Sequence, residues 1–528
     1  MLNNHINPIT RLDYPDPDVI RVGDTYYMVS TTMYFMPGCE ILRSHNLVNW
    51  EHAAYVYNKL DSTSGQCLSG KENIYGQGMW AASLRYHNKT FYVCFVANDT
   101  HKTYLYTSKE ITGPWKKSII PGFYHDNSML FDDDGKIYIV YGNREIHITE
   151  LCFNDSAGDC ELKPKDNGIN KIIIRDSDNS PLGYEGSHFY KIGGKYYIFL
   201  INIPKSTGKR TESCFVADKP EGPYIGKAVM SDDRGFRGSG VAQGGIVDTP
   251  SGKWYSILFQ DSGAVGRIPI LMPVSWNKEL IKKDDKTFSQ VNFPVFGTAG
   301  IIPDNFDIED LHPDYKYNPL VSGSFFDTAS ESFGFKGCWQ FNHEPDLDLI
   351  KKDTAHDSFS ITTDKLCINL VQARNVLTQR TLFPGCKCSV NIDGSGLDEG
   401  DYAGLCLLES NYAFIGLTKR NGEYYLVMCN REIATGGIWG ERHDNESAVE
   451  IKSVRLDAPN ATLYSSVTYD SYLLKDIADD NSYIAYPEKD DTVSFYYSVM
   501  DSIPEKLGTD HDLKFTLDHF TGARFGLF

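Results

Sequence analysis

The stretch PDPDVIRVGDTYYMVS, residues 15–30, shows the pattern that organises the first three hundred residues. It runs from a Pro-Asp-Pro-Asp segment into a short apolar strand, a turn containing Gly and Asp, and a second strand rich in Tyr. Two strands joined by such a turn predict a β-hairpin. Asp-Pro pairs usually mark an ordinary turn, so this one could simply begin a strand or could also position a carboxylate.

Four later segments repeat this hairpin pattern: WAASLRYHNKTFYVCF (80–95), DNSMLFDDDGKIYIVY (126–141), EGSHFYKIGGKYYIFL (185–200) and QGGIVDTPSGKWYSIL (243–258). Their first residues, taken with Asp16, are 46 to 64 residues apart, which is the length of a four-stranded blade with its loops. The repeat predicts a five-bladed β-propeller over residues 1–300, in which the first strand of each blade lines the central axis. The alternative is an all-β protein with unrelated hairpins.

The composition changes after Pro294. The segment 301–321 is rich in Pro, Asp and Asn and predicts a linker. From residue 322 onward, segments such as GEYYLVMCNRE (422–432) are typical of antiparallel sheets with one solvated face, and they predict a β-sandwich over 322–528. The expected fold class is therefore all-β: a five-bladed propeller followed by a jelly-roll or concanavalin-like sandwich.

Charge and hydropathy exclude several classes of partner. A formal net charge of −19 argues against nucleic acid, whose binding needs clustered Lys and Arg. No apolar run approaches the roughly 20 residues of a membrane-spanning helix. The N-terminal residues have no signal-peptide pattern, and Cys94, Cys367 and Cys429 lie in apolar runs typical of reduced thiols. We expect a cytoplasmic protein, or a secreted one if a signal peptide has been removed.

Three of the five blade starts carry an acid: Asp16, Asp126 and Glu185. If the first strands converge on the axis, these carboxyl groups form one site and raise one another's pKa. Hydrolysis of a glycosidic bond needs two carboxyls in opposite protonation states, so such crowding suits that chemistry. Taken singly, Asp16 could be only a turn residue between prolines, and Asp126 could be an Asx-turn residue.

Several of these strings resemble glycoside hydrolase family 43. The signature regions are YPDPDVIRVGDTYY, HDNSMLFDDDGKIYIVYG and YEGSHFYKIGGKYYIFL, and the second and fifth blades match in MWAASLRYHNKTFYV and QGGIVDTPSGKWYSILFQDSGAVGRIPILMPVSW. WQFNHEPD and QARNVLTQRT resemble the sandwich domain of the β-xylosidases in this family. The resemblance implies a propeller enzyme that cleaves β-xylosides or α-L-arabinofuranosides with inversion.

The resemblance also implies roles for individual residues. The general base falls on Asp16 rather than Asp18, because the family motif places the base between the two prolines. The aspartate that adjusts the pKa and orientation of the acid falls on Asp126, and the general acid falls on Glu185. The arginine that contacts sugar hydroxyls falls on Arg267.

The remaining predicted substrate-binding residues are three aromatic rings and one amide. Trp80, Tyr34 and Phe35 are candidates for apolar faces against a sugar ring, and the alternative for each, favoured for Tyr34 and Phe35, is ordinary core packing. Gln243 occupies the place where many relatives carry a His that holds a water cluster or a calcium ion. The second-blade segment reads Trp-Ala-Ala-Ser where the family often has Trp-Ala-Pro and an acid. No cofactor is expected to be required, and Ca²⁺ near the axis is an open expectation because an amide oxygen can still bind it.

The expected function is an exo-acting, inverting hydrolase that releases terminal xylose from xylo-oligosaccharides or arabinoxylan fragments. Arabinofuranosidase activity stays open, because both sugars are pentoses. Inversion requires the Asp16 and Glu185 carboxyls to lie about 6.5–9.5 Å apart. The competing hypotheses are a carbohydrate-binding propeller without catalysis and an interaction scaffold, neither of which needs three converging acids.

Overall fold

The computed structural model describes residues 6–154, 161–176, 179–236, 238–282, 288–326, 332–433, 444–470, 491–500 and 502–528. Strands dominate these ranges, and the helical segments among them are 3-10 turns of three residues. None of the helices found there combines the length and apolar character that a membrane crossing requires. The expected all-β class is confirmed.

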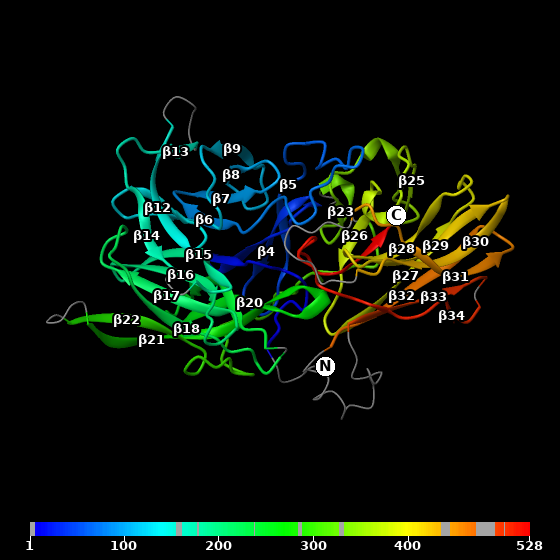
Figure 1. Ribbon diagram of the computed structural model, residues 1–528. Coiled ribbons are helices and arrows are strands. Elements are labelled where there is room, and N and C mark those ends of the chain that lie inside the picture. Colours follow the sequence, from blue (N-terminus) through cyan, green and yellow to red (C-terminus); the bar gives the residue numbers. More distant parts are fainter. Residues whose placement is uncertain are drawn as a thin grey trace.

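Five antiparallel sheets stand round a common axis in the described part of residues 6–296 (Figure 1). Their strands are β1 (Asp18–Val22), β2 (Thr25–Ser30), β4 (Gly38–Ser44) and β5 (Glu51–Tyr57); β6 (Ser83–His87), β7 (Thr90–Ala97), β8 (Lys102–Ser108) and β9 (Lys116–Ile120); β10 (Ser128–Phe131), β11 (Ile137–Tyr141), β12 (Glu145–Phe153), β13 (Leu162–Pro164) and β14 (Asn170–Arg175); β15 (Leu182–Ile192), β16 (Lys195–Ile203), β17 (Thr211–Ala217) and β18 (Ile225–Met230); and β19 (Val241–Asp248), β20 (Trp254–Asp261), β21 (Arg267–Lys282) and β22 (Phe288–Phe296).

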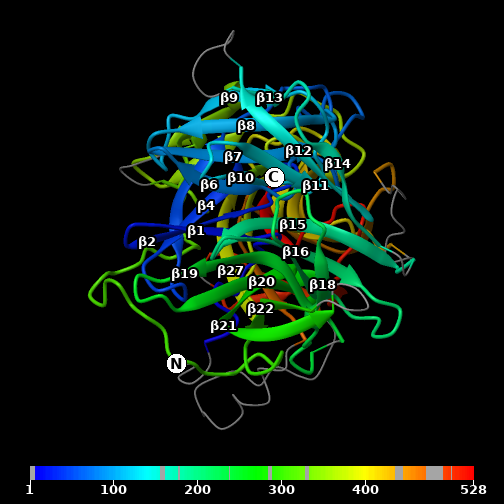
Figure 2. The ribbon, with the colours of Figure 1, turned by 90° about the vertical axis from the view of Figure 1, so that its left-hand side faces the viewer.

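The first strand of each sheet lies innermost. Contacts join β1 to β6, β6 to β10, β10 to β15, β15 to β19 and β19 back to β1, so these strands form a closed ring. Figure 2 shows them around the middle of the propeller, with β9, β13 and β18 nearer the rim. The predicted five-bladed propeller is confirmed, and each repeated segment is the first hairpin of one blade.

Short turns explain why the repeated segments fold as hairpins. The Asn88–Lys89 and Gly193–Gly194 pairs each connect two strands with positive φ at both residues, which is the geometry of a type I′ turn. This turn matches the right-handed twist of the flanking strands, so the two apolar strands pair at once.

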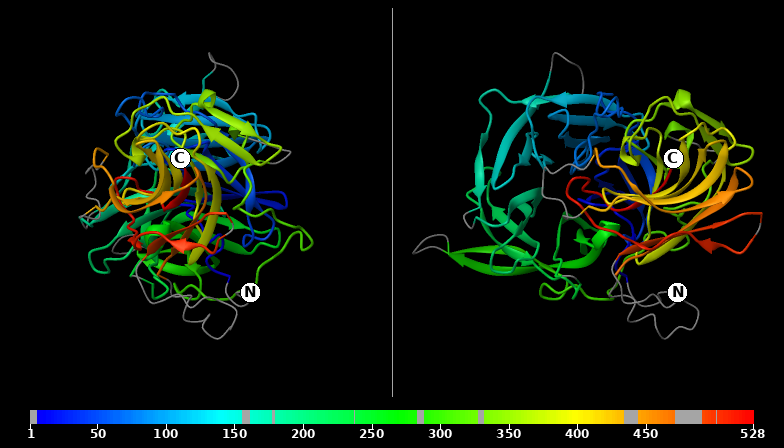
Figure 3. Two further views of the ribbon diagram at one scale, coloured as in Figure 1. Left: turned by 90° about the vertical axis from the view of Figure 1, so that its right-hand side faces the viewer. Right: turned by 45° about the vertical axis from the view of Figure 1, so that its right-hand side comes forward.

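The C-terminal domain is a sandwich of two curved sheets (Figure 3). The larger sheet has the order β3-β23-β26-β36-β28-β29-β30-β31 and the smaller one has β27-β32-β33-β34, with β35 paired to β33. Their bounds are β3 (Phe35–Met36), β23 (Gln340–Asn342), β26 (Leu377–Arg380), β27 (Gly385–Asp393), β28 (Tyr402–Leu408), β29 (Ala413–Arg420), β30 (Glu423–Asn430), β31 (Val449–Leu456), β32 (Asn460–Thr468), β33 (Thr492–Ser498), β34 (Glu505–Lys506), β35 (His511–Asp512) and β36 (Arg524–Leu527); a hairpin of β24 (Ile350–Asp353) and β25 (Ser358–Ile361) lies beside them.

Inward side chains of both sheets share one core. Leu405 and Ile415 of the larger sheet pack with Leu463 and Phe495 of the smaller one, and all four are fully or almost fully buried. Such a core is the expected result of alternating patterns on antiparallel strands.

The two domains share a sheet. The short strand β3 leaves the first blade and pairs with β23, with Phe341 opposite Met36 and Asn342 opposite Phe35. The propeller therefore contributes the edge strand of the larger sandwich sheet. A two-residue strand whose partner lies about three hundred positions away leaves no periodic signal, so this link was not predicted from the sequence.

Candidate active site

The middle of the propeller is filled by an ion-pair network around Asp18 and Arg85. Arg85 donates from Nη1 to Asp18 Oδ2 at 2.7 Å and from Nη2 to Ser128 Oγ at 2.6 Å. Asp18 also accepts the Leu84 amide at 2.8 Å, and its Oδ1 lies 3.1 Å from His188 Nδ1. Burial alone would raise the pKa of Asp18, but Arg85 and His188 hold it below its usual value. Asp18 therefore links the first blade to the second and fourth blades.

Asp16, two residues earlier, lies at the entrance to the first strand. The residue is 7% exposed, and its carboxylate accepts Arg267 Nη1 at Oδ1 (2.8 Å) and Thr31 Oγ1 at Oδ2 (2.7 Å). These two bonds fix the plane of the carboxylate while each oxygen keeps a second lone pair. The two aspartates of the Pro-Asp-Pro-Asp segment therefore differ in their surroundings. Asp18 bonds to residues of other blades, whereas the Asp16 carboxylate is fixed in orientation and can still accept further hydrogen bonds.

The same strained backbone recurs at three blade starts. Asp16, Asp126 and Gln243 have φ of 52°, 48° and 59°. Non-glycine residues rarely adopt this region, at a cost on the order of 1–3 kcal/mol each, and such residues cluster at functional sites. The repetition at equivalent positions indicates that the backbone turns each of these side chains toward a common place.

Asp126 and Glu185 lie together with His125. The Gly186 amide donates to Asp126 Oδ2 at 3.1 Å, and His125 Nε2 lies 3.7 Å from both Asp126 Oδ2 and Glu185 Oε2. Asn143 donates to Glu185 Oε2 from its side-chain amide. Glu185 pairs with Ile201 between two register shifts in the β15–β16 ladder, so irregular backbone on both sides sets the direction of its side chain.

Burial and mutual charge shift the pKa values of these groups. Burial raises the pKa of Asp16 against the opposing effect of Arg267, and Asp126 raises it further. Burial likewise raises the pKa of Asp126, against His125 and together with Glu185. For His125, burial opposes protonation, but the carboxylates of Asp126 and Glu185 raise its pKa to about 9. The site therefore combines a cationic imidazole with carboxyl groups whose proton affinity is increased.

Arg267 connects the carboxylates to the sandwich. It is 3% exposed, and its guanidinium carbon lies 4.4 Å from the ring centre of Phe520 and 5.3 Å from that of Phe259. Its Nε and Nη2 are buried without a hydrogen-bond partner, which leaves donors for a ligand. Trp80 lies 5.9 Å from Phe520 and 5.8 Å from His125, ring centre to ring centre. Two aromatic rings therefore flank the carboxylate end of the channel.

The backbone near the C-terminus carries Phe520 to this place. Asp13 accepts the Arg267 amide at Oδ1 (2.7 Å) and the Gly522 amide at Oδ2 (2.9 Å). A Cβ on Gly266 would lie 2.3 Å from Asp13 Oδ1, so glycine is required for this approach. One carboxylate thus fixes the fifth blade and a sandwich segment at the same point.

Gln243 lies behind the acids. A Cβ on Gly186, next to Glu185, would lie 2.7 Å from the Gln243 side chain. The backbone N–H of Gln243 donates to Glu212 Oε2 at 2.8 Å. Glu212 is fully buried, and burial raises its pKa to about 8. Arg210 binds Asp261 at 2.5 Å, and its charge acts on Asp16 and Glu185.

The structure brings Asp16, Asp126, Glu185, Arg267 and Trp80 together and places Gln243 directly behind Glu185. It does not bring Tyr34 and Phe35 there. They are 0% and 1% exposed, in the cluster that joins the two domains, where Tyr34 OH lies 3.0 Å from Thr521 Oγ1 and Phe35 stacks under Arg524 at 3.5 Å. Their predicted place against a sugar is corrected: they are packing residues. The aromatic content of the sequence indicated that rings were available, but it could not show whether a given ring lies in the sugar site or between the two domains.

The residues near Gln243 give no support for a calcium ion. Among the described residues, the cluster of His, Asp and Glu ligands at this end of the channel is His125, Asp126 and Glu185, with ligand atoms within 4.8 Å of one another. It includes an imidazole, whereas Ca²⁺ takes six to eight oxygen ligands. No chemical step is therefore assigned to a metal.

Five site residues were not found by sequence reasoning: Thr31, His125, Asn143, Arg210 and Phe520. His125 and Thr31 had a usable signal, because His125 directly precedes an anchor acid and Thr31 directly follows the first hairpin. Asn143 lies in the β11–β12 turn, Arg210 directly precedes β17 and Phe520 lies in the other domain, and only the fold brings them near.

Comparison with known proteins gives family matches to both domains. The model of Glycosyl hydrolases family 43 matches residues 5–280, and that of the beta xylosidase C-terminal concanavalin A-like domain matches residues 331–528. A beta-xylosidase of Formosa agariphila is 29% identical over 380 residues, which is 65% of this chain and 59% of that protein. A non-reducing end alpha-L-arabinofuranosidase of Bacteroides ovatus is 27% identical over 79% of this chain and 76% of its own length.

A solved structure from Bacteroides eggerthii, described as a bifunctional GH43-CE, superimposes with a TM-score of 0.83 at 36% identity and covers 99% of this chain. This chain covers 61% of that protein, so it spans about three fifths of the length of both this relative and the Formosa beta-xylosidase.

Proposed function

This chain belongs to glycosyl hydrolase family 43, and we propose that it is an exo-acting, inverting hydrolase that releases terminal xylose from β-1,4-linked xylo-oligosaccharides. The observation that carries the proposal is the meeting of Asp16, Asp126 and Glu185 beside Arg267, whose buried Nε and Nη2 have no hydrogen-bond partner. A scaffold or a simple binding protein has no need for three buried or half-buried acids at such a point.

In the proposed mechanism, Asp16 is the general base. Arg267 and Thr31 hold its carboxylate, and burial raises its proton affinity, which favours removal of a proton from an attacking water. Glu185 is the general acid and protonates the departing glycosidic oxygen. Asp126 accepts the backbone N–H of Gly186, the residue after Glu185, so it fixes the backbone that carries the acid.

The sandwich supports an exo-acting site. Phe520 stands beside Arg267 and Trp80, so the second domain covers part of the carboxylate end of the channel. A covered end suits a pocket for one terminal sugar better than an open groove for a polymer. The aromatic faces of Trp80 and Phe520 suit the apolar faces of a pyranose ring.

Xylose is preferred over arabinose as the first substrate because the sandwich matches the C-terminal domain model of beta xylosidases. Arabinofuranosidase activity is a second candidate, supported by the similarity to the Bacteroides ovatus arabinofuranosidase. The two activities are ranked by measuring kcat/KM on 4-nitrophenyl β-D-xylopyranoside and on 4-nitrophenyl α-L-arabinofuranoside. Failure to hydrolyse either glycoside, with binding of xylobiose retained, would favour a carbohydrate-binding protein.

Two substitutions test the role of the proposed acid and that of the proposed base independently. Asp16→Ala should lower kcat about 10²–10⁴-fold on both xylobiose and 2,4-dinitrophenyl β-D-xyloside, because both need an activated water. Glu185→Ala should lose a similar factor on xylobiose but far less on the dinitrophenyl substrate, whose leaving group needs no proton. Circular dichroism controls for folding, and ¹H NMR should show α-xylose as the first product. Equal losses on both substrates in the Glu185 variant, or β-xylose appearing first, would contradict the assignment.

A further inference from the structure

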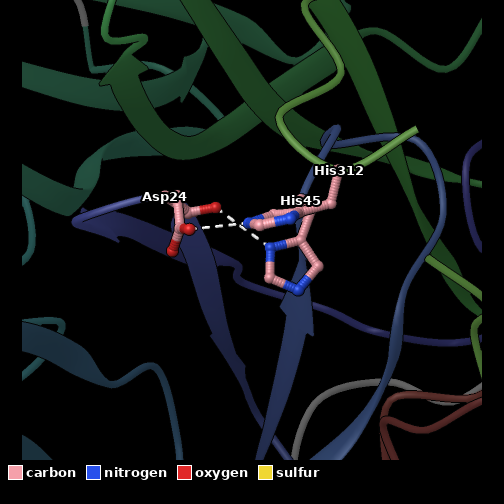
Figure 4. Close-up of side chains that lie close together, drawn as sticks. All are labelled: Asp24, His45 and His312. Carbon is pink, nitrogen blue, oxygen red and sulfur yellow. Dashed lines mark hydrogen bonds and ion pairs between the residues drawn. The ribbon is translucent and has the colours of Figure 1, made fainter. Parts of the chain in front are cut away.

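A second cluster of ligand-type side chains joins the first blade to the segment between β22 and β23, and it contains none of the carboxylates at the blade starts. We propose that Asp24, His45 and His312 form a binding site for one divalent transition-metal ion of the zinc class. Their ligand atoms lie within 4.8 Å of one another, and the three side chains converge in Figure 4. The inference goes beyond the proposed glycosidase function and does not depend on it.

The three residues come from separate segments. Asp24 lies in the β1–β2 turn, His45 follows β4, and His312 lies in the segment between β22 and β23. His312 Nε2 lies 2.6 Å from Asp24 Oδ2, and His45 Nδ1 lies 3.0 Å from the Asp24 carbonyl oxygen. The two imidazole rings are 4.4 Å apart, centre to centre, at 70°. Both rings therefore direct a nitrogen toward the same residue.

The segment that carries His312 is held in place without help from the cluster. The Leu311 amide donates to the His45 carbonyl at 3.0 Å, and Tyr317 OH accepts the His45 amide at 2.8 Å. Asp310 accepts Asn46 Nδ2 at 2.9 Å and the His312 amide at 3.0 Å. These bonds hold the backbone near His45 and His312, so side-chain rotation is the main adjustment that these two ligands need.

The donor set selects the class of metal. Two imidazoles and one carboxylate suit Zn²⁺ and its neighbours in the first transition row, whereas Ca²⁺ and Mg²⁺ prefer oxygen. With metal–ligand bonds of about 2.0–2.2 Å, tetrahedral donors are roughly 3.3–3.6 Å apart. The ligand atoms lie within 4.8 Å of one another, and the His312 Nε2–Asp24 Oδ2 pair at 2.6 Å would have to open slightly to admit an ion. The His312 and Asp24 side chains are 44% and 64% exposed, so water can complete the coordination.

A bound ion would connect the interdomain segment to the first blade. Because the ligands are assembled only in the folded chain, binding should stabilise it by mass action.

The test is calorimetric titration of ZnCl₂ into the full-length, tag-free, chelator-stripped protein at pH 7.5, with Asp24→Asn and His312→Gln as site variants. His356→Gln is the matched control, because His356 is also an exposed histidine beside an aspartate, with Nδ1 2.8 Å from Asp353 Oδ2. We expect one binding event in the wild type and in the control, and a fall in affinity of about 100-fold or more in each site variant.

Two further measurements keep the outcome unambiguous. Co²⁺ substitution should give the visible spectrum of a bound N/O-ligated ion in the wild type and lose it in His312→Gln. Thermal unfolding should move to higher temperature with Zn²⁺ only in proteins that retain the site. The proposal is overturned if the wild type binds no Zn²⁺, if both site variants bind as tightly as the wild type, or if the control loses the event as well.

Discussion

At the scale of single residues, the opening Pro-Asp-Pro-Asp segment shows how far sequence reasoning reaches. The repeat located the segment at a blade start, but both aspartates fit that position. The structure distinguishes them by their partners: Asp18 has three, Arg85, His188 and the Leu84 backbone amide, whereas each Asp16 oxygen has one and keeps a lone pair beside Arg267. Arg85, His188 and Arg267 come from other blades, so no local pattern could have supplied these partners.

Glu212 provides a residue-scale prediction about pH and stability. Burial raises its pKa to about 8, compared with 4.5 for an exposed glutamate. Between these values the folded chain keeps a proton that the unfolded chain releases, so this group makes the free energy of unfolding fall as pH rises from about 4.5 to 8. The full effect is on the order of a few kcal/mol.

Glu212→Gln replaces the carboxyl by a neutral group of the same shape, and the new side-chain oxygen can still accept the hydrogen bond from the Gln243 backbone N–H. Thermal unfolding should show the variant and wild type nearly equal at pH 5, with the variant more stable at pH 8.5. Glu423→Gln, at an exposed position, should change the melting temperature equally at both pH values. If the difference in melting temperature between the wild type and Glu212→Gln does not vary with pH, Glu212 is not protonated in the folded protein.

At the scale of elements, the five hairpins were predictable because each carries its own turn and its own apolar strands. The bulges that direct the site residues were harder to predict from the sequence. Register shifts flank Glu185 and leave Gln243 out of its ladder, and an extra residue in a strand changes the spacing too little to be read against natural variation. The family resemblance assigned these residues, and the structure supplies the reason for their position.

Gly186 tests the importance of this local geometry. Its φ is 64°, and an added Cβ would lie 2.7 Å from the Gln243 side chain, so Gly186→Ala must both strain the backbone and move Gln243. Because the Gly186 amide also binds Asp126, we expect kcat to fall by about tenfold or more, with a loss of stability of about 1–3 kcal/mol.

Gly194→Ala is the matched control for that substitution. Gly194 lies in the hairpin turn of the same two strands with φ of 77°, and nothing lies within 4 Å of its added Cβ. It should lose about 1 kcal/mol of stability and keep the wild-type kcat on an aryl xyloside. Equal kcat losses in the two variants would mean that backbone strain, and not the contact with Gln243, disturbs the site.

At the scale of the whole molecule, the sequence separated two β domains but gave no sign of how closely they depend on each other. The propeller donates β3 to the sandwich, and the sandwich returns Phe520 to the propeller. Both links join residues hundreds of positions apart, and neither has a compositional signal. The assignment of Tyr34 and Phe35 to the sugar site was wrong for the same reason: an interdomain surface needs apolar rings as much as a sugar pocket does.

Arg380 allows this dependence to be measured. From β26 of the sandwich it donates to Glu40 Oε2 of the first blade at 2.6 Å and to the Asp13 carbonyl at 2.8 Å, and it lies 4.1 Å over the Tyr14 ring. Glu40 is 1% exposed, and although burial alone would raise its pKa, Arg380 and His52 lower it to about 2. Arg380→Met would leave that carboxylate buried beside His52, at a cost of about 3–5 kcal/mol.

Asp13 also holds Arg267 and Gly522, so loosening the contact around Arg380 should displace Phe520 and raise KM on xylobiose more than it lowers kcat. Arg420→Met removes a partly exposed ion pair with Glu450 within one sheet, and should cost less than about 1 kcal/mol with no kinetic effect. In the double variant Arg380→Met/Glu40→Gln, removing the stranded charge should restore part of the lost melting temperature but not the KM. If Arg380→Met unfolds like the Arg420 control and keeps the wild-type KM, the two domains are joined without being energetically coupled at the site.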